Sequence, residues 1–118
     1  MLPAQATPRD VQLAVAKHGF SRFVIAAPTG APTQYVHIKD VLDLSSAEHR
    51  DAPVPASRLR DLVDVAATAE AEEALSVLRA SGSHLARVTD ANGEPVGVLF
   101  LEDIIEELIG EVQDAAQR

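Results

Sequence analysis

The sequence predicts a mixed α/β (α+β) fold built from two copies of one β-α-β-β-α unit. A chain of 118 residues with 47% hydrophobic residues is long enough and apolar enough to form a core without a partner. Four identical residues recur at one offset of 63 positions, and apolar positions around them recur in the same register. The matched pairs are Gly19 and Gly82, Gly30 and Gly93, Pro32 and Pro95, and Asp40 and Asp103.

Each unit is predicted to open with a strand and a helix. The first strand lies near Leu2, and Thr7 then suits a helix N-cap, with Pro8 at the first helical position. That helix is expected to run to about Lys17. In the second unit, residues 69–82 place small and apolar side chains on one helical face and end in a glycine, which predicts the equivalent helix.

Two apolar strands are predicted to follow each helix. Residues 23–26 and 85–89 form the first of them, and residues 33–38 and 96–101 return after a turn. The Asn-Gly pair at 92–93 accommodates the positive φ angles of a tight hairpin. Both return strands are almost continuously apolar, so we expect them to be buried on both faces.

The chain is predicted to divide into three parts. Residues 1–44 form the first repeat, residues 45–61 a linker, and residues 62–118 the second repeat with an acidic C-terminal helix. The linker prediction comes from the prolines and polar residues of SSAEHRDAPVPAS.

Composition and motifs exclude several classes of function. Eighteen acidic against ten basic residues give a formal charge of -8, which argues against nucleic-acid binding. The chain has no cysteine, no apolar stretch near the roughly 18 residues of a membrane span, and no signal-peptide pattern, so we expect a soluble, untargeted chain. No phosphate loop, nucleophile elbow or His-Glu-x-x-His motif is present, and we expect no enzyme.

The segment HLARVTDANGEPVGVLFLEDIIEELIGEV, residues 84–112, resembles a known family. It is similar to the second cystathionine-β-synthase-type (CBS) repeat of the CorC/HlyC and cyclin M group of magnesium and cobalt transport proteins. Residues 21–23 and 36–40 resemble the matching parts of the first repeat. The resemblance implies a tandem CBS pair, or Bateman module, with its repeats about a pseudo-two-fold axis.

The same resemblance implies a function. Many such pairs form homodimers and bind an adenosine nucleotide (ATP, ADP or AMP) between the repeats, in some cases with Mg²⁺ carried by the nucleotide. In this family an integral membrane domain precedes the CBS pair. The chain is therefore expected to be a regulatory domain on the cytoplasmic face of a longer membrane transport protein. The alternative is a structural dimerisation module whose clefts are closed and bind no nucleotide.

Asp40 and Asp103 are the leading candidates for a nucleotide contact. Each follows an apolar strand and lies in the first turn of a predicted helix, where one fixed carboxylate can accept both hydroxyls of a ribose. A purely capping role remains open, because the helix dipole by itself favours an acid there by about 0.3–1 kcal/mol. The wider CBS pattern has Ser or Thr three residues before the aspartate, and this chain has His37 and Phe100.

Other site residues are predicted with their alternatives. Phe100 could stack on a base or fill the cleft, and His37 could be a half-buried strand residue. Arg22 could neutralise a phosphate or remain exposed, and His84 could line the second cleft or act as a structural hydrogen bonder. The acidic series of the last helix is expected to be a solvated face and no metal site; it comprises Glu102, Asp103, Glu106, Glu107, Glu111 and Asp114.

Overall fold

The computed structural model describes the backbone of residues 1–116 and the side chains of residues 1–110. The chain divides into an N-terminal unit, Met1–Asp61, and a C-terminal unit, Leu62–Arg118. Glu111 and Asp114 of the acidic series lie outside the described side chains. Within the described residues, no helix combines the length and the hydropathy needed to cross a membrane.

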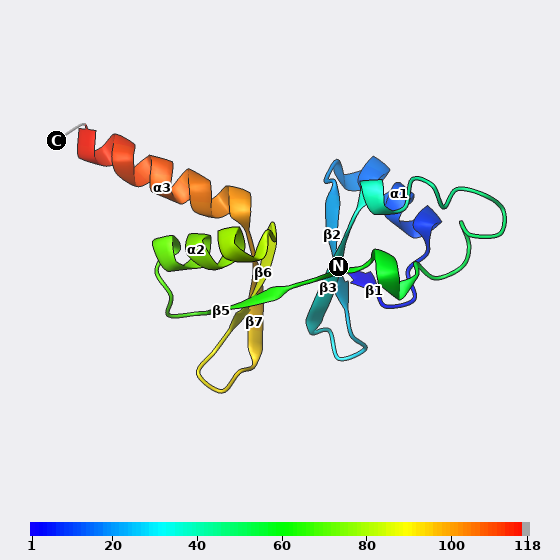
Figure 1. Ribbon diagram of the computed structural model, residues 1–118, viewed down its shortest axis with the longest axis horizontal. Coiled ribbons are helices and arrows are strands. Elements are labelled where there is room, and N and C mark those ends of the chain that lie inside the picture. Colours follow the sequence, from blue (N-terminus) through cyan, green and yellow to red (C-terminus); the bar gives the residue numbers. More distant parts are fainter. Residues whose placement is uncertain (117–118) are drawn as a thin grey trace. The chain divides into compact units, whose positions relative to one another are not determined.

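The N-terminal unit is a four-stranded sheet with one α-helix (Figure 1). Its strands lie in the order β1-β2-β3-β4; β1 is parallel to β2, and the other neighbours are antiparallel. The elements are β1 (Leu2–Pro3), α1 (Pro8–His18), β2 (Arg22–Ala26), β3 (Pro32–His37) and β4 (Arg60–Asp61).

The start of α1 is held by a capping box, in which Thr7 is the N-cap that the sequence predicts. The Thr7 Oγ1 accepts a hydrogen bond from the Asp10 backbone N–H at 3.1 Å, and an Asp10 carboxylate oxygen accepts one from the Thr7 N–H at 2.9 Å. Pro8 occupies the first turn, where its missing N–H costs no helical bond. Gly19 ends the helix in the left-handed conformation with φ of 75°.

The prediction of an α-helix behind Asp40 is wrong. The chain forms only a 3₁₀ turn there, η1 (Ile38–Asp40), and a second one later, η2 (Ala56–Arg58). The following residues, Asp43 and the Ser45-Ser46 pair, have side chains that compete for backbone hydrogen bonds and weaken a helix. The equivalent stretch of the second repeat is rich in Glu, Leu and Ile, which favour helix.

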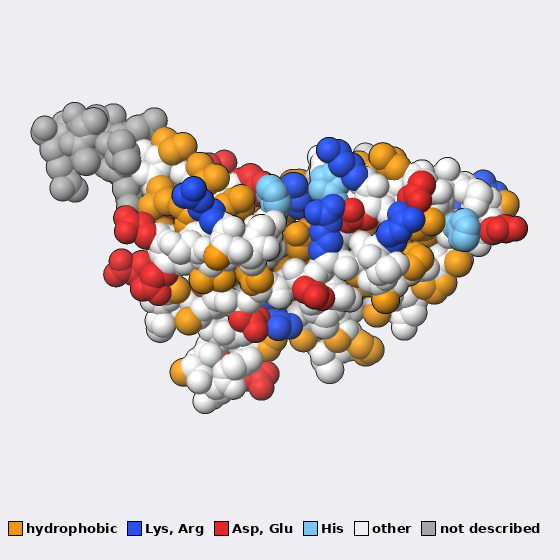
Figure 2. All heavy atoms as spheres, viewed as in Figure 1, with side chains coloured by type: hydrophobic (Ala, Val, Ile, Leu, Met, Phe, Trp, Pro, Cys, Tyr) orange, Lys and Arg blue, Asp and Glu red, His pale blue; other side chains and the backbone are white. Residues whose placement is uncertain are grey.

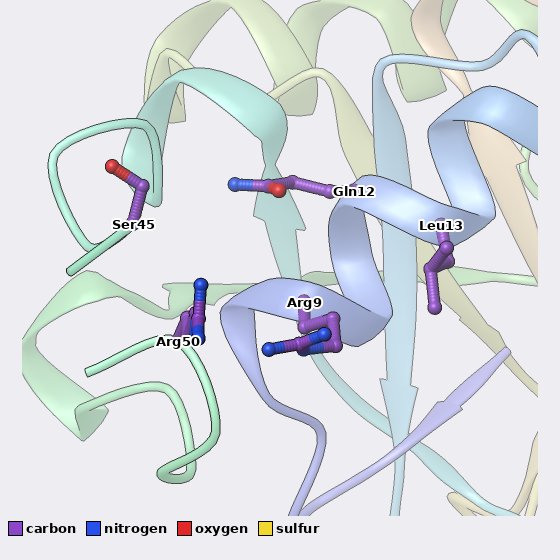
Figure 3. Close-up of a pocket in the computed structure, with 5 residues that line it drawn as sticks. All are labelled: Arg9, Gln12, Leu13, Ser45 and Arg50. Atoms are coloured by element: carbon purple, nitrogen blue, oxygen red, sulfur yellow. The ribbon is translucent and has the colours of Figure 1, made fainter. Parts of the chain in front are cut away.

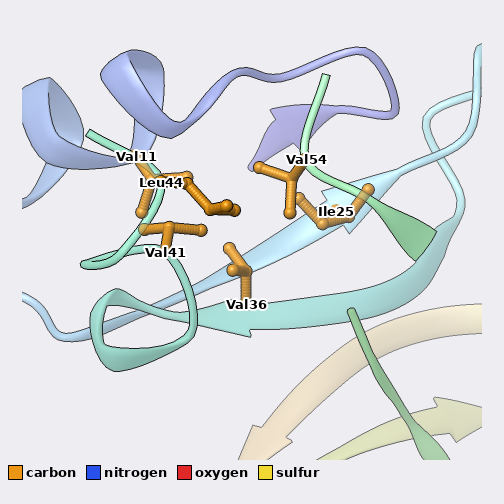
Figure 4. Packing of buried hydrophobic residues seen from close by; sticks show 6 residues of the cluster. All are labelled: Val11, Ile25, Val36, Val41, Leu44 and Val54. Carbon is orange, nitrogen blue, oxygen red and sulfur yellow. The ribbon is translucent and has the colours of Figure 1, made fainter. Parts of the chain in front are cut away.

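A small apolar core joins α1, the sheet and the chain after η1. Figure 4 shows its side chains pointing toward one another. Val54 belongs to this core, so the segment predicted as a linker packs against the N-terminal unit and returns through β4 to pair with β3. The six buried members are Val11, Ile25, Val36, Val41, Leu44 and Val54.

The C-terminal unit is a three-stranded sheet with two helices packed on it. Its strand order is β5-β6-β7, with β5 parallel and β7 antiparallel to β6. Figure 1 shows α2 and α3 side by side, which confirms the mixed α+β prediction for this unit. The elements are β5 (Val63–Ala66), α2 (Ala71–Ser81), β6 (Leu85–Thr89), β7 (Pro95–Phe100) and α3 (Leu101–Ala116).

The C-terminal core lies between this sheet and its helices. Leu78 of α2 is completely buried, and Ile104 of α3 packs into the same cluster with Val65 and Ala86 of the sheet. Leu101 and Leu108 extend the apolar side of α3 by one turn in each direction. The residues behind β7 therefore supply one wall of the core as well as an acidic surface.

The prediction that both return strands are buried on both faces is wrong for β7. Val96 and Phe100 are exposed, whereas β3 ends in three buried residues. The strand order places β7 at an edge of its sheet, while β3 has β2 on one side and β4 on the other. An edge strand has only one strand neighbour, so apolar composition by itself does not bury it.

We expect Leu78→Ala to lower the free energy of unfolding by about 2–5 kcal/mol, because a completely buried side chain is lost and a cavity remains. Leu13→Ala is the matched control, since Leu13 lies exposed on α1, and its effect should stay within about 0.5–1 kcal/mol. Urea unfolding of the three proteins measures both values. Equal losses in the two variants would contradict the described core.

Candidate functional site

The turn η1 holds Asp40 through the backbone just before it. An Asp40 carboxylate oxygen accepts a hydrogen bond from the His37 N–H at 3.0 Å, and the His37 Nδ1 accepts one from the Lys39 N–H at 3.0 Å. The two side chains thus form a capping box at the start of this short turn. The direction of the Asp40 carboxylate is fixed, as the sequence suggests. The element that fixes it is a 3₁₀ turn and not the predicted α-helix.

Asp40 also forms a two-pronged ion pair with Arg60 of β4. The Arg60 Nη2 lies 2.7 Å from Oδ1 of Asp40, and its Nε lies 2.9 Å from Oδ2. The Asp40 side chain is only 15% exposed, and that of Arg60 is 45% exposed. Burial alone would raise the pKa of the Asp40 carboxyl, but the hydrogen bonds from Arg60 and from the His37 N–H outweigh it and lower that pKa.

A second arginine holds the chain just after Asp40. The Arg58 guanidinium donates to both carboxylate oxygens of Asp43, at 2.7 and 2.8 Å, and to the Asp40 backbone carbonyl at 2.9 Å. Sequence reasoning did not find Arg58 and Arg60, because they lie in the stretch predicted as a linker. The available signal was the Arg-Leu-Arg pattern at 58–60, the densest basic stretch of an acidic chain.

His37 and Arg22 are neighbours across the sheet. They are register partners on β3 and β2, and His37 is only 8% exposed. Burial lowers the pKa of the His37 imidazole, the positive charges of Arg22, Arg60 and Lys39 lower it further, and Asp40 opposes them. The structure thus brings together three of the predicted site residues, Arg22, His37 and Asp40.

The other three predicted residues gather at the start of α3. Phe100 ends β7 opposite Leu85 and is 36% exposed. The His84 backbone carbonyl accepts a hydrogen bond from the Leu101 N–H at 2.9 Å. The Nδ1 of the His84 side chain lies 3.6 Å from Oε1 of Glu102. Asp103 is exposed in the first turn of α3, and it makes no ion pair or side-chain hydrogen bond with the described part of the chain.

The two units differ strongly in charge. Residues 1–61 contain seven of the ten Lys and Arg residues and six of the eighteen acids, whereas residues 62–118 contain three basic and twelve acidic residues. Figure 2 shows basic side chains gathered over the N-terminal unit. An anionic group is therefore attracted to the N-terminal unit and repelled by the C-terminal one.

A hollow of about 320 Å³ lies elsewhere on the N-terminal unit, between α1 and the segment after η1 (Figure 3). Both arginines that line it form ion pairs with Asp51. The Arg9 Nε lies 2.7 Å from an Asp51 carboxylate oxygen, and the Arg50 Nε lies 3.6 Å from the other. None of the predicted site residues lines this hollow, whose lining consists of Arg9, Gln12, Leu13, Ser45 and Arg50.

Comparison with known protein sequences finds one family and several relatives. The model of the CBS domain family matches residues 57–110. An uncharacterized protein of Mycobacterium tuberculosis is 38% identical over 108 residues, which are 92% of this chain and 31% of that protein. A UPF0053 protein of the same organism is 32% identical over 114 residues, 96% of this chain and 25% of that protein. The chain spans a third or less of these relatives.

Solved structures show the same fold. The CBS domain of a bacterial CNNM/CorC family Mg²⁺ transporter in complex with ATP has a TM-score of 0.80 and 28% identity, with 92% of this chain and 78% of that chain covered. A CBS domain protein of Pyrobaculum aerophilum complexed with AMP has a TM-score of 0.69 and 27% identity, with 92% and 89% covered. A hemolysin-like protein of Oenococcus oeni, at 22% identity and a TM-score of 0.78 over 92% and 79% of the two chains, shares the fold.

We expect Asp40→Asn to lower the free energy of unfolding at pH 7 by about 1–3 kcal/mol, because Arg60 loses its charged partner. The Asp40 pKa is lower in the folded state than the ordinary 3.8, so the unfolded chain takes up the proton first as the pH falls. The stability contributed by Asp40 is therefore complete above about pH 5 and is lost as the pH falls through the folded-state pKa.

Urea unfolding of wild type and Asp40→Asn at a series of pH values measures this contribution. The difference between the two proteins should shrink below about pH 4. Asp103→Asn is the matched control at the equivalent position of the second repeat, and it should cost no more than about 1 kcal/mol, the range of the helix-dipole effect. Similar losses in both variants at pH 7 would show that the Arg60 pair contributes nothing.

Proposed function

The chain contains a CBS domain and resembles the CBS domains of the CNNM/CorC family of Mg²⁺ transporters, and we propose that it is a regulatory module that binds an adenosine nucleotide. The single observation that carries this proposal is the 28% identity, over 92% of the chain, to a CBS domain solved in complex with ATP. The AMP complex of the Pyrobaculum relative supports the same ligand class. The module is not an enzyme; it acts through binding.

Asp103 is the better candidate for the ribose contact. Its carboxylate is exposed in the first turn of α3, and both of its oxygens can accept hydroxyl donors. The two Asp40 oxygens already accept hydrogen bonds from Arg60 and from the His37 N–H. A ribose at Asp40 would have to displace a charged partner, so we assign Asp40 a structural role and Asp103 the ligand role.

We propose that the N-terminal unit contacts the phosphate groups of the nucleotide. Arg22 is the register partner of His37, and the positive charges of Arg22 and Lys39 both lower the pKa of His37. Charged donors form the stronger hydrogen bonds to phosphate oxygens. Any Mg²⁺ is carried by the nucleotide. In the part of the chain that the structure describes, no group of three or more His, Cys, Asp and Glu side chains is placed to hold a metal ion.

The regulated activity belongs to a longer protein. The matched regions make up only 31% and 25% of the two curated relatives, which are therefore much longer than this chain. We place the module on the cytoplasmic face of a membrane ion-transport domain. A nucleotide that prefers one arrangement of the two units shifts the transporter by no more than the difference between its affinities for the two arrangements.

A structural dimerisation module with closed clefts is the second candidate. The Asp40–Arg60 pair favours it for the first repeat, since the carboxylate predicted to meet a ligand is already occupied. The exposure of Asp103 and Phe100 opposes it for the second repeat. The two candidates differ in one observable, which is a response to nucleotide.

Homodimer formation is part of the proposal, and α2 and α3 offer a surface for it. These helices contact each other, and each exposes apolar side chains beside its buried ones. Ile105 is 41% exposed and Ile109 is 51% exposed, one helical turn apart on α3, while Val77 lies on α2. An apolar strip of this kind on the surface of a small unit commonly marks a contact with another protein.

We expect millimolar ATP, ADP or AMP, with or without Mg²⁺, to raise the thermal unfolding temperature of the chain. A ligand at about 100 times its dissociation constant adds roughly 2.7 kcal/mol, or several degrees for a domain of this size. Asp103→Asn should abolish most of the shift while leaving the fold intact. Glu107→Gln, an exposed acid on the same helix, is the matched control and should respond like wild type. No shift with any nucleotide would favour the structural module.

We expect the double variant Ile105→Glu, Ile109→Glu to shift the chain from dimer to monomer, because four charges per dimer would be buried in an apolar contact. Sedimentation equilibrium over a range of protein concentrations measures the change. Leu42→Glu, an exposed apolar position of the N-terminal unit, is the control and should stay dimeric. A dimer that survives the double variant would place the contact on another surface.

A further inference from the structure

The hollow on the N-terminal unit lies between two segments that are far apart in the sequence (Figure 3). Arg9, Gln12 and Leu13 of α1 form one side of it, and Ser45 and Arg50 of the segment after η1 form the other. All of these residues belong to the N-terminal unit. The volume of the hollow, about 320 Å³, is close to the lower limit of small-molecule sites, roughly 300 Å³. The hollow can therefore hold a small ligand.

Direct bonds between the two segments hold the sides of the hollow together. The Arg50 backbone carbonyl accepts a hydrogen bond from the Arg9 N–H at 3.1 Å, in the first turn of α1, where backbone donors have no partner within the helix. The Arg9 guanidinium donates to both carboxylate oxygens of Asp51, at 2.7 and 3.1 Å. Val11 and Leu44, next to lining residues in the sequence, are buried in one core. Both sides are thus held in place before any ligand binds.

The hollow has an excess of positive charge. Two arginines line it, and both form their ion pairs with the same acid, Asp51. The Asp51 oxygens accept hydrogen bonds from Arg9, whereas the Arg50 Nε lies 3.6 Å away, which is too long for a hydrogen bond. Within the described residues, the Arg50 guanidinium makes no hydrogen bond. Its donors are therefore available to an oxygen of a ligand, while Arg9 offsets the charge of Asp51.

Two neutral side chains add further donors to the hollow. The Gln12 amide carries two N–H donors, and the Ser45 hydroxyl carries one. Neither side chain makes a hydrogen bond to the part of the chain that the structure describes. Figure 3 shows the Gln12 side chain extending from α1 toward the segment that carries Ser45. With Arg50, these groups offer donors from both sides of the hollow, which suits the three acceptor oxygens of a phosphate group better than the two of a carboxylate.

We propose that this hollow binds a small phosphate monoester, with the phosphate group against Arg50, Gln12 and Ser45 and the organic part against Leu13. Leu13 is 61% exposed and gives the lining an apolar side chain. The residues proposed to contact the nucleotide do not line the hollow, so this site goes beyond the proposed function and does not depend on it. The module would then respond to a second class of ligand.

The experiment titrates the isotope-labelled chain with phenyl phosphate and follows its amide signals by NMR. At about pH 7.5 a phosphate monoester is almost fully ionised, since its second proton titrates near pH 6, and low ionic strength limits screening. We expect saturable shifts of the Gln12 side-chain amide and of the backbone amides of residues 45–50. Benzoate is the matched ligand, because it carries the same ring on a carboxylate, and it should bind several-fold more weakly.

Three variants test the assigned residues. Arg50→Gln removes the guanidinium and should weaken phenyl phosphate binding about tenfold or more, because a charged hydrogen bond is lost. Gln12→Ala removes two donors with a good helix former and should weaken binding several-fold. Arg79→Gln, on the exposed surface of α2, makes the same change in net charge and should bind like wild type. The spectra also show whether each variant is folded, and Gln12→Ala tests the site even if Arg50→Gln does not fold.

The outcomes separate this inference from the proposed function. Shifts that persist unchanged in both Arg50→Gln and Gln12→Ala, or equal affinities for phenyl phosphate and benzoate, overturn the inference. Shifts confined to Lys39 and its neighbours place the phosphate at the proposed nucleotide contact, which overturns the inference and supports the proposed function. A chain that binds phenyl phosphate in the hollow and does not respond to ATP, ADP or AMP supports the inference and overturns the proposed function.

Discussion

The structure depends on one constraint: each small sheet must have its apolar side covered by the chain that follows its last long strand. A sheet of three or four short strands has little core of its own, and its stability comes from what packs on it. In the C-terminal unit α3 meets this need with Ile104. In the N-terminal unit the segment after η1 does so with Val41, Leu44 and Val54, and its return through β4 adds a strand. The two repeats solve one packing problem with different secondary structure.

This difference carries over to the two aspartates at equivalent positions of the repeat. In the first repeat the segment after η1 returns to place Arg58 and Arg60 beside η1, and Arg60 forms an ion pair with the Asp40 carboxylate. In the second repeat the helix continues away from β7, and Asp103 stays exposed in its first turn. One sequence pattern therefore gives a structural ion pair in one unit and an available carboxylate in the other.

Sequence patterns predicted the local features well, since these depend on neighbours along the chain. The Thr7-Pro8 helix start and the helix end at Gly82 need only a few adjacent residues, and both are confirmed. The candidate residues Arg22, His37 and Asp40 do meet in one unit, because the β2–β3 hairpin sets their register. The α-helix predicted after Asp40 does not form, because helix propensity is weak there. Val41 and Leu44 pack into the core from a 3₁₀ turn and the irregular chain that follows it.

By itself, the sequence determined where the first helix begins and where the hairpin turns fall, and it predicted two copies of one unit and the residues that could meet a nucleotide. Those properties are local or repeated, so they can be read along the chain. Only the tertiary structure decided that Arg60 holds Asp40, that the segment 45–61 is part of a core, and that β7 is exposed. Each of these depends on contacts between residues far apart in the chain, or on whether a strand lies at an edge, and no periodicity encodes either.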